Sequence, residues 1–321
     1  MQGKIINRVK TSIQRRLNQL CAYDYPGENA GWHKYENNPV LGNTTTGSLF
    51  DPCVRKIDGL YIMCLSCRRT HSIKMLSSED GYTWNWDNAV EILVGINNSN
   101  WETRVNRACF LVKDNIWHLW YTGQNNGISK IGYAVSKDGI NYIRMSSEPV
   151  LIPEYDFEGE NVMNPCVLWD EEKCIYCMWY AAGEGYEPDV ICYAESKDGK
   201  HWVKRTKPIK CADPEIAYEK SKVGACDVIR SSDNKYVMAY IAYQNVNVSR
   251  ICLAYSDNPT DAWKKIDDVP ILSPEKGKWD AHAVYKPTLC IDQDNNSTIL
   301  WYNGRAEHNE RIGVATLKRI I

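Results

Sequence analysis

The chain has 321 residues, of which 44% are hydrophobic and 24% charged, a composition typical of globular proteins. The formal net charge of −2 gives no overall attraction to nucleic acid or to an anionic membrane. There are 12 Trp and 20 Tyr but only 3 Phe. Because Trp and Tyr combine apolar area with a polar group, this bias favours half-buried strands and sugar-facing surfaces.

The first twenty residues combine basic side chains with apolar side chains at helical spacing. The apolar positions are Ile5, Ile6, Val9, Ile13, Leu17 and Leu20. The pattern predicts a short amphipathic helix that packs on its own domain, and membrane association is not expected. No apolar run has the length of a signal peptide or a membrane span, so we predict a cytoplasmic protein.

The 13 cysteines are an odd number, and a cytoplasmic protein is expected to keep them reduced. Two CxxC pairs, Cys64/Cys67 and Cys174/Cys177, lie in strand-like apolar segments. Residues three apart on a strand point to opposite faces, so neither pair is expected to bind a metal ion. The six histidines show no HxH or HExxH spacing, and no metal or cofactor is predicted.

Four kinds of segment recur in a constant order, about sixty residues apart. The opening segments are DPCV at 51–54, RACF at 107–110, NPCV at 164–167, ACDV at 225–228 and KPTL at 286–289. Aromatic-rich segments follow, beginning at Leu60, Trp117, Tyr176, Tyr236 and Thr298. Their alternating pattern and β-forming residues predict strands.

The third segment of each repeat ends in a turn, such as SKDG at 136–139 and again at 196–199. Asp-Gly is typical of tight turns between strands. Outer strands are expected at Trp32–Leu41, Trp84–Leu93, Tyr142–Leu151, Trp202–Ile209 and Trp263–Leu272.

Four strands repeated five times predict an all-β fold, a five-bladed β-propeller with four-stranded blades. The chain begins with an outer strand and ends with a third strand, so Arg311–Leu317 should pair with Trp32–Leu41 and close the ring. We therefore expect an N-terminal helix and lead-in at 1–30 and one propeller domain at 31–321.

The first strand of each blade lines the central channel of a propeller. This places Asp51, Arg107, Asn164, Ala225 and Lys286 near the channel mouth. Upstream of four of these positions an aromatic residue precedes an acid. The pairs are Trp101-Glu102, Phe157-Glu158, Tyr218-Glu219 and Trp279-Asp280. These acids either brace neighbouring strands or face the channel as catalytic groups.

The SKDG turns, the MWY strand and the Asp51-Pro52 dipeptide resemble the five-bladed propeller glycosidases. These include glycoside hydrolase families 43 and 32 and the mannoside phosphorylases of family 130, and the resemblance covers residues 32–317. It implies that Asp51 matches the general base of family 43. Asn106-Arg107 and the segment VGACDV stand where family 43 places its other two acids.

Cleavage of a glycosidic bond by inversion needs a carboxylic acid that protonates the leaving oxygen, and in hydrolysis a second carboxylate that activates water. The predicted catalytic residues are Asp51, Glu160 and Asp227. The predicted substrate-binding residues are Glu102, Arg107, Asn164, Asp280, His282, Tyr285, Lys286 and Arg305. Cations at Arg107 and Lys286 favour an anionic ligand, which is inorganic phosphate, a sugar acid or a sugar nucleotide.

The sequence thus predicts an enzyme that cleaves glycosidic bonds in a carbohydrate, as a hydrolase or a phosphorylase. Two alternatives stay open: a glycosyltransferase of cytoplasmic glycan synthesis on the same propeller, and a glycan-binding propeller without catalytic activity.

Overall fold

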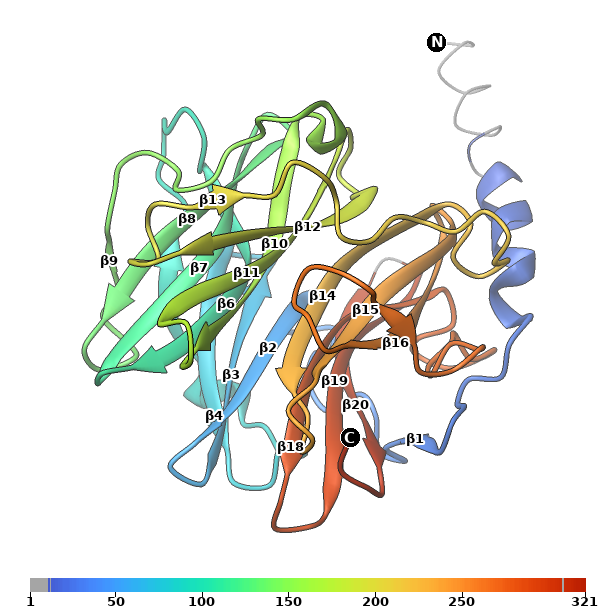
Figure 1. Ribbon diagram of the computed structural model, residues 1–321. Coiled ribbons are helices and arrows are strands. Elements are labelled where there is room, and N and C mark those ends of the chain that lie inside the picture. The colour runs from blue at the N-terminus through green and yellow to red at the C-terminus, as the bar shows by residue number, and fades with distance from the viewer. Residues whose placement is uncertain (1–10, 12, 308) are drawn as a thin grey trace, which may run out of the picture.

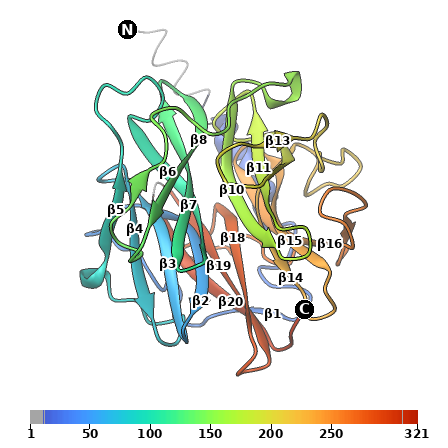
Figure 2. The same cartoon turned by 60° about the vertical axis from the view of Figure 1, so that its left-hand side comes forward.

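The computed structural model describes residues 11, 13–307 and 309–321. Five four-stranded antiparallel sheets stand around a common axis and form a five-bladed propeller (Figures 1 and 2). Blade one contains β2–β5, blade two β6–β9, blade three β10–β13 and blade four β14–β17, while blade five joins β18–β20 to β1. The predicted fold is confirmed.

Each blade runs outward from the axis in the order of the chain. The inner strands are β2 (Leu49–Ile57), β6 (Arg104–Lys113), β10 (Asn161–Asp170), β14 (Lys222–Arg230) and β18 (Ala283–Asp292). The second strands are β3 (Leu60–Cys67), β7 (Ile116–Asn125), β11 (Ile175–Gly183), β15 (Tyr236–Asn245) and β19 (Ser297–Ala306). The third strands are β4 (Ser72–Ser78), β8 (Ile128–Ser136), β12 (Val190–Ser196), β16 (Val248–Ser256) and β20 (Asn309–Leu317).

The outer strands are shorter than the sequence pattern predicts. They are β5 (Val90–Val94), β9 (Ile143–Arg144), β13 (Val203–Lys204), β17 (Lys264–Lys265) and β1 (Trp32–Lys34). A second, isolated bridge near the end of the segment, such as Ile131 with Leu151 in blade two, continues the pairing. Proline precedes this second bridge, at Pro149 in blade two, and proline has no N–H for a continuous ladder.

The ring closes through the two ends of the chain, as predicted. In blade five Trp32 pairs with Leu317 and Lys34 with Ala315, and the bridge between Leu41 and Ile312 extends the contact. The last sheet therefore has its fourth strand from the N-terminal part of the chain, and no blade is left with an unpaired third strand.

The repeated tryptophans and turns bind neighbouring blades to each other. The indole N–H of Trp120 in β7 donates to the carbonyl of Gly199, in the turn that follows β12 of the next blade, at 2.8 Å. Trp301 makes the same bond to Gly81 at 2.8 Å. Gly199 has a φ of +73°, and a Cβ there would lie 2.9 Å from the Trp120 ring. Both the conformation and the close ring therefore require glycine at this turn.

The four aromatic–acid pairs form equivalent braces inside the blades. In each brace the buried acid accepts a hydrogen bond from a tyrosine of the blade's second strand. The same acid forms an ion pair with a basic residue of the outer strand. The sets are Glu102 with Tyr121 and Arg144, Glu158 with Tyr180 and Lys204, Glu219 with Tyr240 and Lys265, and Asp280 with Tyr302 and Lys34. The bracing interpretation accounts for all four acids, because each is at most 1% exposed and a buried carboxylate requires such partners.

Short helices lie outside the blades. Residues 13–19 are α-helical and run into the 3₁₀ turn η1 (Leu20–Tyr23). The other 3₁₀ turns are η2 (Trp86–Asn88) and η3 (Asp156–Glu158). The predicted apolar positions before residue 11 lie outside the described residues. No helix in the described part of the chain is long and apolar enough to cross a membrane.

All thirteen cysteines carry free thiols. Cys64 and Cys67 are buried in β3, while Cys177 is buried in β11 and Cys174 is exposed before it. Among the described residues, no group of three or more His, Cys, Asp or Glu side chains is placed to hold a metal ion.

Candidate active site

Every inner strand carries one extra residue near its start. In blade one the pairing of β2 with β3 jumps from Phe50–Ser66 to Cys53–Cys64, so three steps on β2 oppose two on β3. The same shift occurs at the corresponding place in the other four blades. A bulge of this kind leaves one residue out of the ladder and redirects its side chain.

The residue at each bulge has a left-handed backbone without being glycine. The five residues and their φ angles are Asp51 (55°), Arg107 (53°), Asn164 (54°), Ala225 (34°) and Lys286 (47°). Such a conformation costs on the order of 1–3 kcal/mol for a residue with a Cβ. The neighbouring blade supports it in three cases, because the backbone N–H of Asp51, Arg107 and Asn164 donates to Asn303, Ser66 and Thr122 respectively.

The five bulge residues lie in one pocket at the mouth of the channel. The pocket has a volume of about 150 Å³. The other polar residues that line it are Arg68, Tyr186, Glu187, Tyr243, Ser249, Tyr285, Arg305 and Glu310. Residues from blades one, two, three, four and five therefore meet at this single place, as the predicted repeat requires.

Asp51 is one of three carboxyl groups that line this pocket. It is 4% exposed, and its Oδ2 accepts a hydrogen bond from Ser66 at 3.2 Å and lies 4.0 Å from Nε of Arg107. Burial raises the pKa of Asp51 above its ordinary value of 3.8, and the charges of Arg107 and Lys286 offset this only in part. A raised pKa suits a proton donor better than the ionised general base that the resemblance to family 43 implies.

Two cations in the pocket have no carboxylate partner. Among the described residues, neither Lys286 nor Arg305 forms an ion pair within 4.0 Å, and Nε of Arg305 is buried without a hydrogen bond. Lys286 is 4% exposed. Burial disfavours its charge, yet Asp51 and other nearby groups together hold the pKa of Lys286 above its ordinary value. A buried lysine and a half-buried arginine without carboxylate partners are complementary to an anionic ligand.

Arg107 and Asn164 are two further polar residues of the pocket. The guanidinium of Arg107 lies over the Tyr186 ring at 4.4 Å, and among the described residues it forms one ion pair, the long one to Asp51. Its Nη1 also donates to Sδ of Met163 at 3.4 Å. Oδ1 of Asn164 is buried without a hydrogen-bond partner. Buried polar atoms normally have partners, so Oδ1 of Asn164 is available to a polar ligand.

Two further carboxylates line the pocket, and each is bound by a tyrosine. Tyr243 donates to Glu187 at 2.8 Å and Tyr285 donates to Glu310 at 2.7 Å. Glu310 also forms an ion pair with Arg68, whose Nε lies 3.0 Å from Oε2. Both of these carboxyl groups are thus engaged by hydrogen-bond donors, whereas burial raises the pKa of Asp51 and favours its protonated form.

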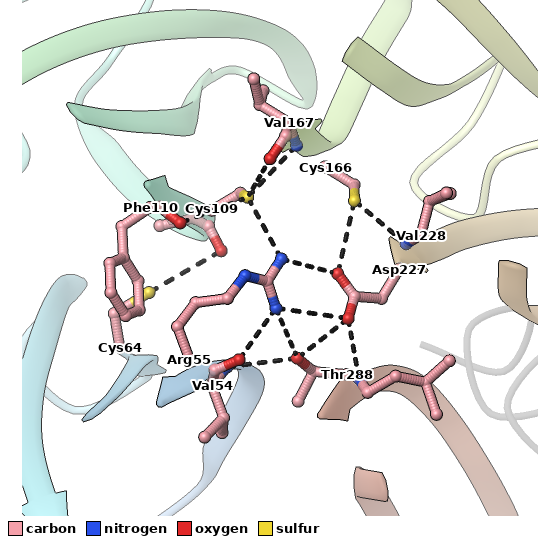
Figure 3. A network of polar contacts seen from close by, with 12 residues as sticks. Val54, Arg55, Cys64, Cys109, Phe110, Cys166, Val167, Asp227, Val228 and Thr288 are labelled. Atoms are coloured by element: carbon pink, nitrogen blue, oxygen red, sulfur yellow. Dashed lines mark hydrogen bonds and ion pairs between the residues drawn. The ribbon is translucent and has the colours of Figure 1, made fainter. Parts of the chain in front are cut away.

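A polar network closes the channel beneath the pocket (Figure 3). Arg55 of β2 reaches across the axis to Asp227 of β14, with Nη2 2.9 Å from Oδ1. Asp227 also accepts hydrogen bonds from Thr288, from the backbone N–H of Leu289 and from Cys166. The Asp227 carboxylate is thus fully occupied and does not line the mouth pocket. We interpret this predicted catalytic residue as part of a structural network.

The remaining predicted site residues lie outside the pocket lining. Glu102 and Asp280 belong to the braces described above. Glu160 is exposed immediately before β10. Nδ1 of His282 accepts a hydrogen bond from the backbone N–H of Glu307 at 2.8 Å. The structure thus brings together a smaller predicted set: Asp51, Arg107, Asn164, Tyr285, Lys286 and Arg305.

Sequence reasoning missed Glu187 and Glu310 as pocket residues. Glu187 lies in the loop between β11 and β12, where the repeat carries an insertion, GEGYEPD, that the other blades lack. Glu310 lies on β20, the third strand of blade five, which pairs with β19. The insertion at 183–189 was a usable signal, because a loop at a propeller mouth that breaks the repeat commonly serves the site.

The chain matches a known protein family from its second blade onward. The family model for β-1,4-mannooligosaccharide phosphorylase, which describes glycoside hydrolase family 130, matches residues 106–319. A 1,2-β-oligomannan phosphorylase of Thermoanaerobacter sp. (strain X514) is 28% identical over 196 residues, which are 58% of this chain and 60% of that protein. The match thus spans less than two thirds of the relative.

Two solved structures have the same fold. A thermostable family 43 glycoside hydrolase superposes with a TM-score of 0.68 at 18% identity, covering 86% of this chain and 91% of the other. A family 130 structure, reported in work on glycoside hydrolases that target β-1,2 mannosidic linkages in Candida mannan, gives a TM-score of 0.69 at 13% identity, covering 91% and 94%. Because the family model matches two thirds of this chain, the chain belongs to glycoside hydrolase family 130.

Proposed function

We propose that the mouth pocket cleaves a β-mannosidic bond by phosphorolysis, with Asp51 as the general acid. The observation that carries the proposal is the unpaired state of Lys286 and Arg305 in the pocket that also holds Asp51. A hydrolase needs only water as the acceptor, whereas a phosphorylase must bind an anion beside the bond that breaks. Two cations without carboxylate partners match the second requirement.

The reaction balances with these groups. An oxygen of inorganic phosphate forms a bond to the anomeric carbon while the bond from that carbon to the leaving oxygen breaks. The proton of Asp51 passes to the leaving oxygen, and the Asp51 carboxylate regains a proton from solvent. The products are a glycosyl phosphate of inverted configuration and a sugar shortened by one unit.

The pocket residues have distinct roles in this proposal. Lys286, Arg305 and Arg107 hold the phosphate oxygens and offset the charge of an anion brought beside a carboxyl group. Asn164 offers its unpartnered Oδ1 as an acceptor for a sugar hydroxyl. Burial keeps Asp51 protonated to a higher pH than an exposed aspartate, which is the condition for acid catalysis near neutrality.

β-1,2-linked mannooligosaccharides are the proposed substrate. This rests on the names of relatives alone: a 1,2-β-oligomannan phosphorylase and a structure associated with β-1,2 mannosidic linkages. The family model itself is described by the β-1,4 linkage, so both linkages belong in the substrate test.

Hydrolysis is the second candidate, because one observation favours it. The charge of Glu310 contributes to raising the pKa of Asp51, so two carboxyl groups interact across the pocket, as in inverting hydrolases. Glu310 is already bound by Arg68 and Tyr285, which leaves it less free to activate water.

The two candidates separate in one experiment. The purified protein is incubated with β-1,2- and β-1,4-mannobiose, with and without inorganic phosphate, and the products are followed by ³¹P NMR and sugar chromatography. The proposal predicts mannose 1-phosphate, formed only when phosphate is present. Free mannose released at the same rate without phosphate would establish hydrolysis and overturn the proposal.

A further inference from the structure

The N-terminal helix is attached to the propeller by its polar side. Asn18 donates to Asn247 at 2.9 Å and its carbonyl accepts from Asn245 at 3.1 Å. Arg15 donates to the carbonyl of Glu307 at 3.3 Å. The buried guanidinium of Arg250 holds the end of the helix through the carbonyl of Cys21 at 2.6 Å. Hydrogen bonds thus hold the helix to the propeller, together with the fully buried Ala22 at its end.

The apolar side of the same helix faces away from the propeller. Ile13 is 53%, Leu17 54% and Leu20 74% exposed. Their spacing of four and three residues places them on one face of the helix. The helix contacts its own domain, as the sequence predicts, but these three apolar side chains stay exposed. Exposed apolar stripes of this kind are typical of interaction surfaces.

The charge of this segment is opposite to that of the rest of the chain. Residues 1–23 contain five basic and no acidic residues, whereas residues 24–321 contain 33 basic and 40 acidic residues. Arg16 lies beside the apolar stripe and is exposed. A basic helix with an exposed apolar stripe is complementary to an anionic lipid surface, where the apolar side chains enter the headgroup boundary and the basic ones contact phosphates.

We propose that the N-terminal helix binds the protein to the surface of an anionic membrane through Ile13, Leu17 and Leu20. Self-association through the same stripe is less favourable, because two such helices would bring their basic residues together without any acid to pair with them. The stripe does not span a bilayer and need not do so, since an amphipathic helix lies in the plane of the interface.

The position of the helix relates this surface to the channel mouth. The hairpin between β15 and β16 carries its contact Asn247 and also the pocket residue Val246, and the hairpin between β19 and β20 carries Glu307 close to the pocket residue Arg305. In Figure 1 the helix stands at the edge of the propeller. A bound membrane would therefore lie beside the rim of the pocket.

Vesicle co-sedimentation of the full chain tests the proposal. Vesicles of phosphatidylcholine alone are compared with vesicles that contain about one third phosphatidylglycerol. We expect sedimentation with the anionic vesicles, weakened at roughly 0.5 M salt. Replacing both Leu17 and Leu20 with Gln should lower the bound fraction by at least about tenfold. The matched control is Ile143→Gln, at a position on β9 that is 71% exposed, and it should bind like the wild type.

Charge is tested by a second pair of variants. Arg16→Gln should weaken binding to the anionic vesicles by about fivefold, whereas Lys207→Gln, at an exposed position on the propeller, should not. Failure to sediment with anionic vesicles, or sedimentation that is unchanged in the double leucine variant, would overturn the proposal. So would a wild-type dimer in light scattering that the leucine variant converts to a monomer, because the second copy would then be the occupant. None of these outcomes bears on phosphorolysis.

Discussion

Nη2 of Arg55 and Oδ1 of Asp227 lie 2.9 Å apart, and this ion pair joins the inner strands of blades one and four across the channel axis. Both side chains are largely buried, with exposed fractions of 18% and 5%. The pair is the centre of a polar network that also includes Thr288 and Cys166 (Figure 3). None of these four residues lines the mouth pocket.

The first prediction concerns the role of Asp227. Arg55→Met leaves its carboxylate buried without its cation, and we expect the free energy of unfolding to fall by about 3 kcal/mol, measured by urea denaturation. The double variant Arg55→Met, Asp227→Leu removes both charges and should recover most of this loss. A folded Asp227→Asn protein that binds substrate but has lost turnover would instead support the catalytic role predicted from the sequence.

The second prediction uses the brace in blade three. Burial raises the pKa of Glu158, but hydrogen bonds from Lys204, Tyr180 and two backbone N–H groups outweigh it and leave the pKa below its ordinary value of 4.5. A depressed carboxyl pKa stabilises the fold above the unfolded-state pKa, and this contribution disappears as the pH falls through the folded-state pKa. Wild-type stability should therefore fall below about pH 4.5, and fall less steeply in Glu158→Gln.

The lysine of this brace, Lys204, can be compared with an exposed lysine nearby in the sequence, Lys207. Lys204→Met removes the cation that faces Glu158 and should cost about 3 kcal/mol, whereas Lys207→Met at an exposed position should change the stability by less than about 0.5 kcal/mol. Equal effects of the two substitutions would show that the brace contributes nothing specific.

The third prediction concerns the anion site. Lys286→Met and Arg305→Met should each raise the KM for phosphate by about ten- to a hundredfold, because a hydrogen bond to a charged group is lost. The exposed Arg69 lies outside the pocket lining, and Arg69→Met serves as the control. If the KM for phosphate is unchanged in both pocket variants, the anion lies elsewhere.

The fold could be predicted from the sequence because the repeat is simple and in phase. The Trp and Asp-Gly positions recur since each pair binds one blade to the next, as Trp120 and Gly199 do. The channel-facing positions followed directly from this alignment, and Asp51, Arg107, Asn164 and Lys286 all line the pocket.

The remaining features could not be predicted from the alignment of the repeats. Glu102 and Asp280 resemble catalytic acids in sequence, and only their buried partners Tyr121 and Lys34 reveal the braces. Glu310 enters the pocket from a third strand, for which the repeat gives no reason to expect a site residue. The helix orientation depended on Asn18 and Arg250, whose hydrogen bonds have no pattern in the sequence.

The fourth prediction is a stability gain on loss of the proposed acid. Because burial raises the pKa of Asp51, ionising this group opposes folding. The contribution of the protonated Asp51 carboxyl group to the free energy of unfolding is fully present below the unfolded-state pKa. It is lost as the pH rises through the folded-state pKa. Asp51→Asn should therefore be more stable than the wild type at pH 7 and equal to it below about pH 3, in thermal or urea unfolding. A less stable variant at pH 7 would contradict this account.

The central claim is that Asp51 donates the proton to the leaving oxygen. It is tested most directly by comparing kcat/KM of Asp51→Asn with that of the wild type on two substrates in the presence of phosphate: a mannobiose and a dinitrophenyl β-mannoside. The dinitrophenolate leaves without a proton. We predict a loss of about 10²–10⁴-fold on the mannobiose and a far smaller loss on the activated glycoside. Equal losses on both substrates, or no loss on the mannobiose, would contradict the assignment of Asp51 as the general acid.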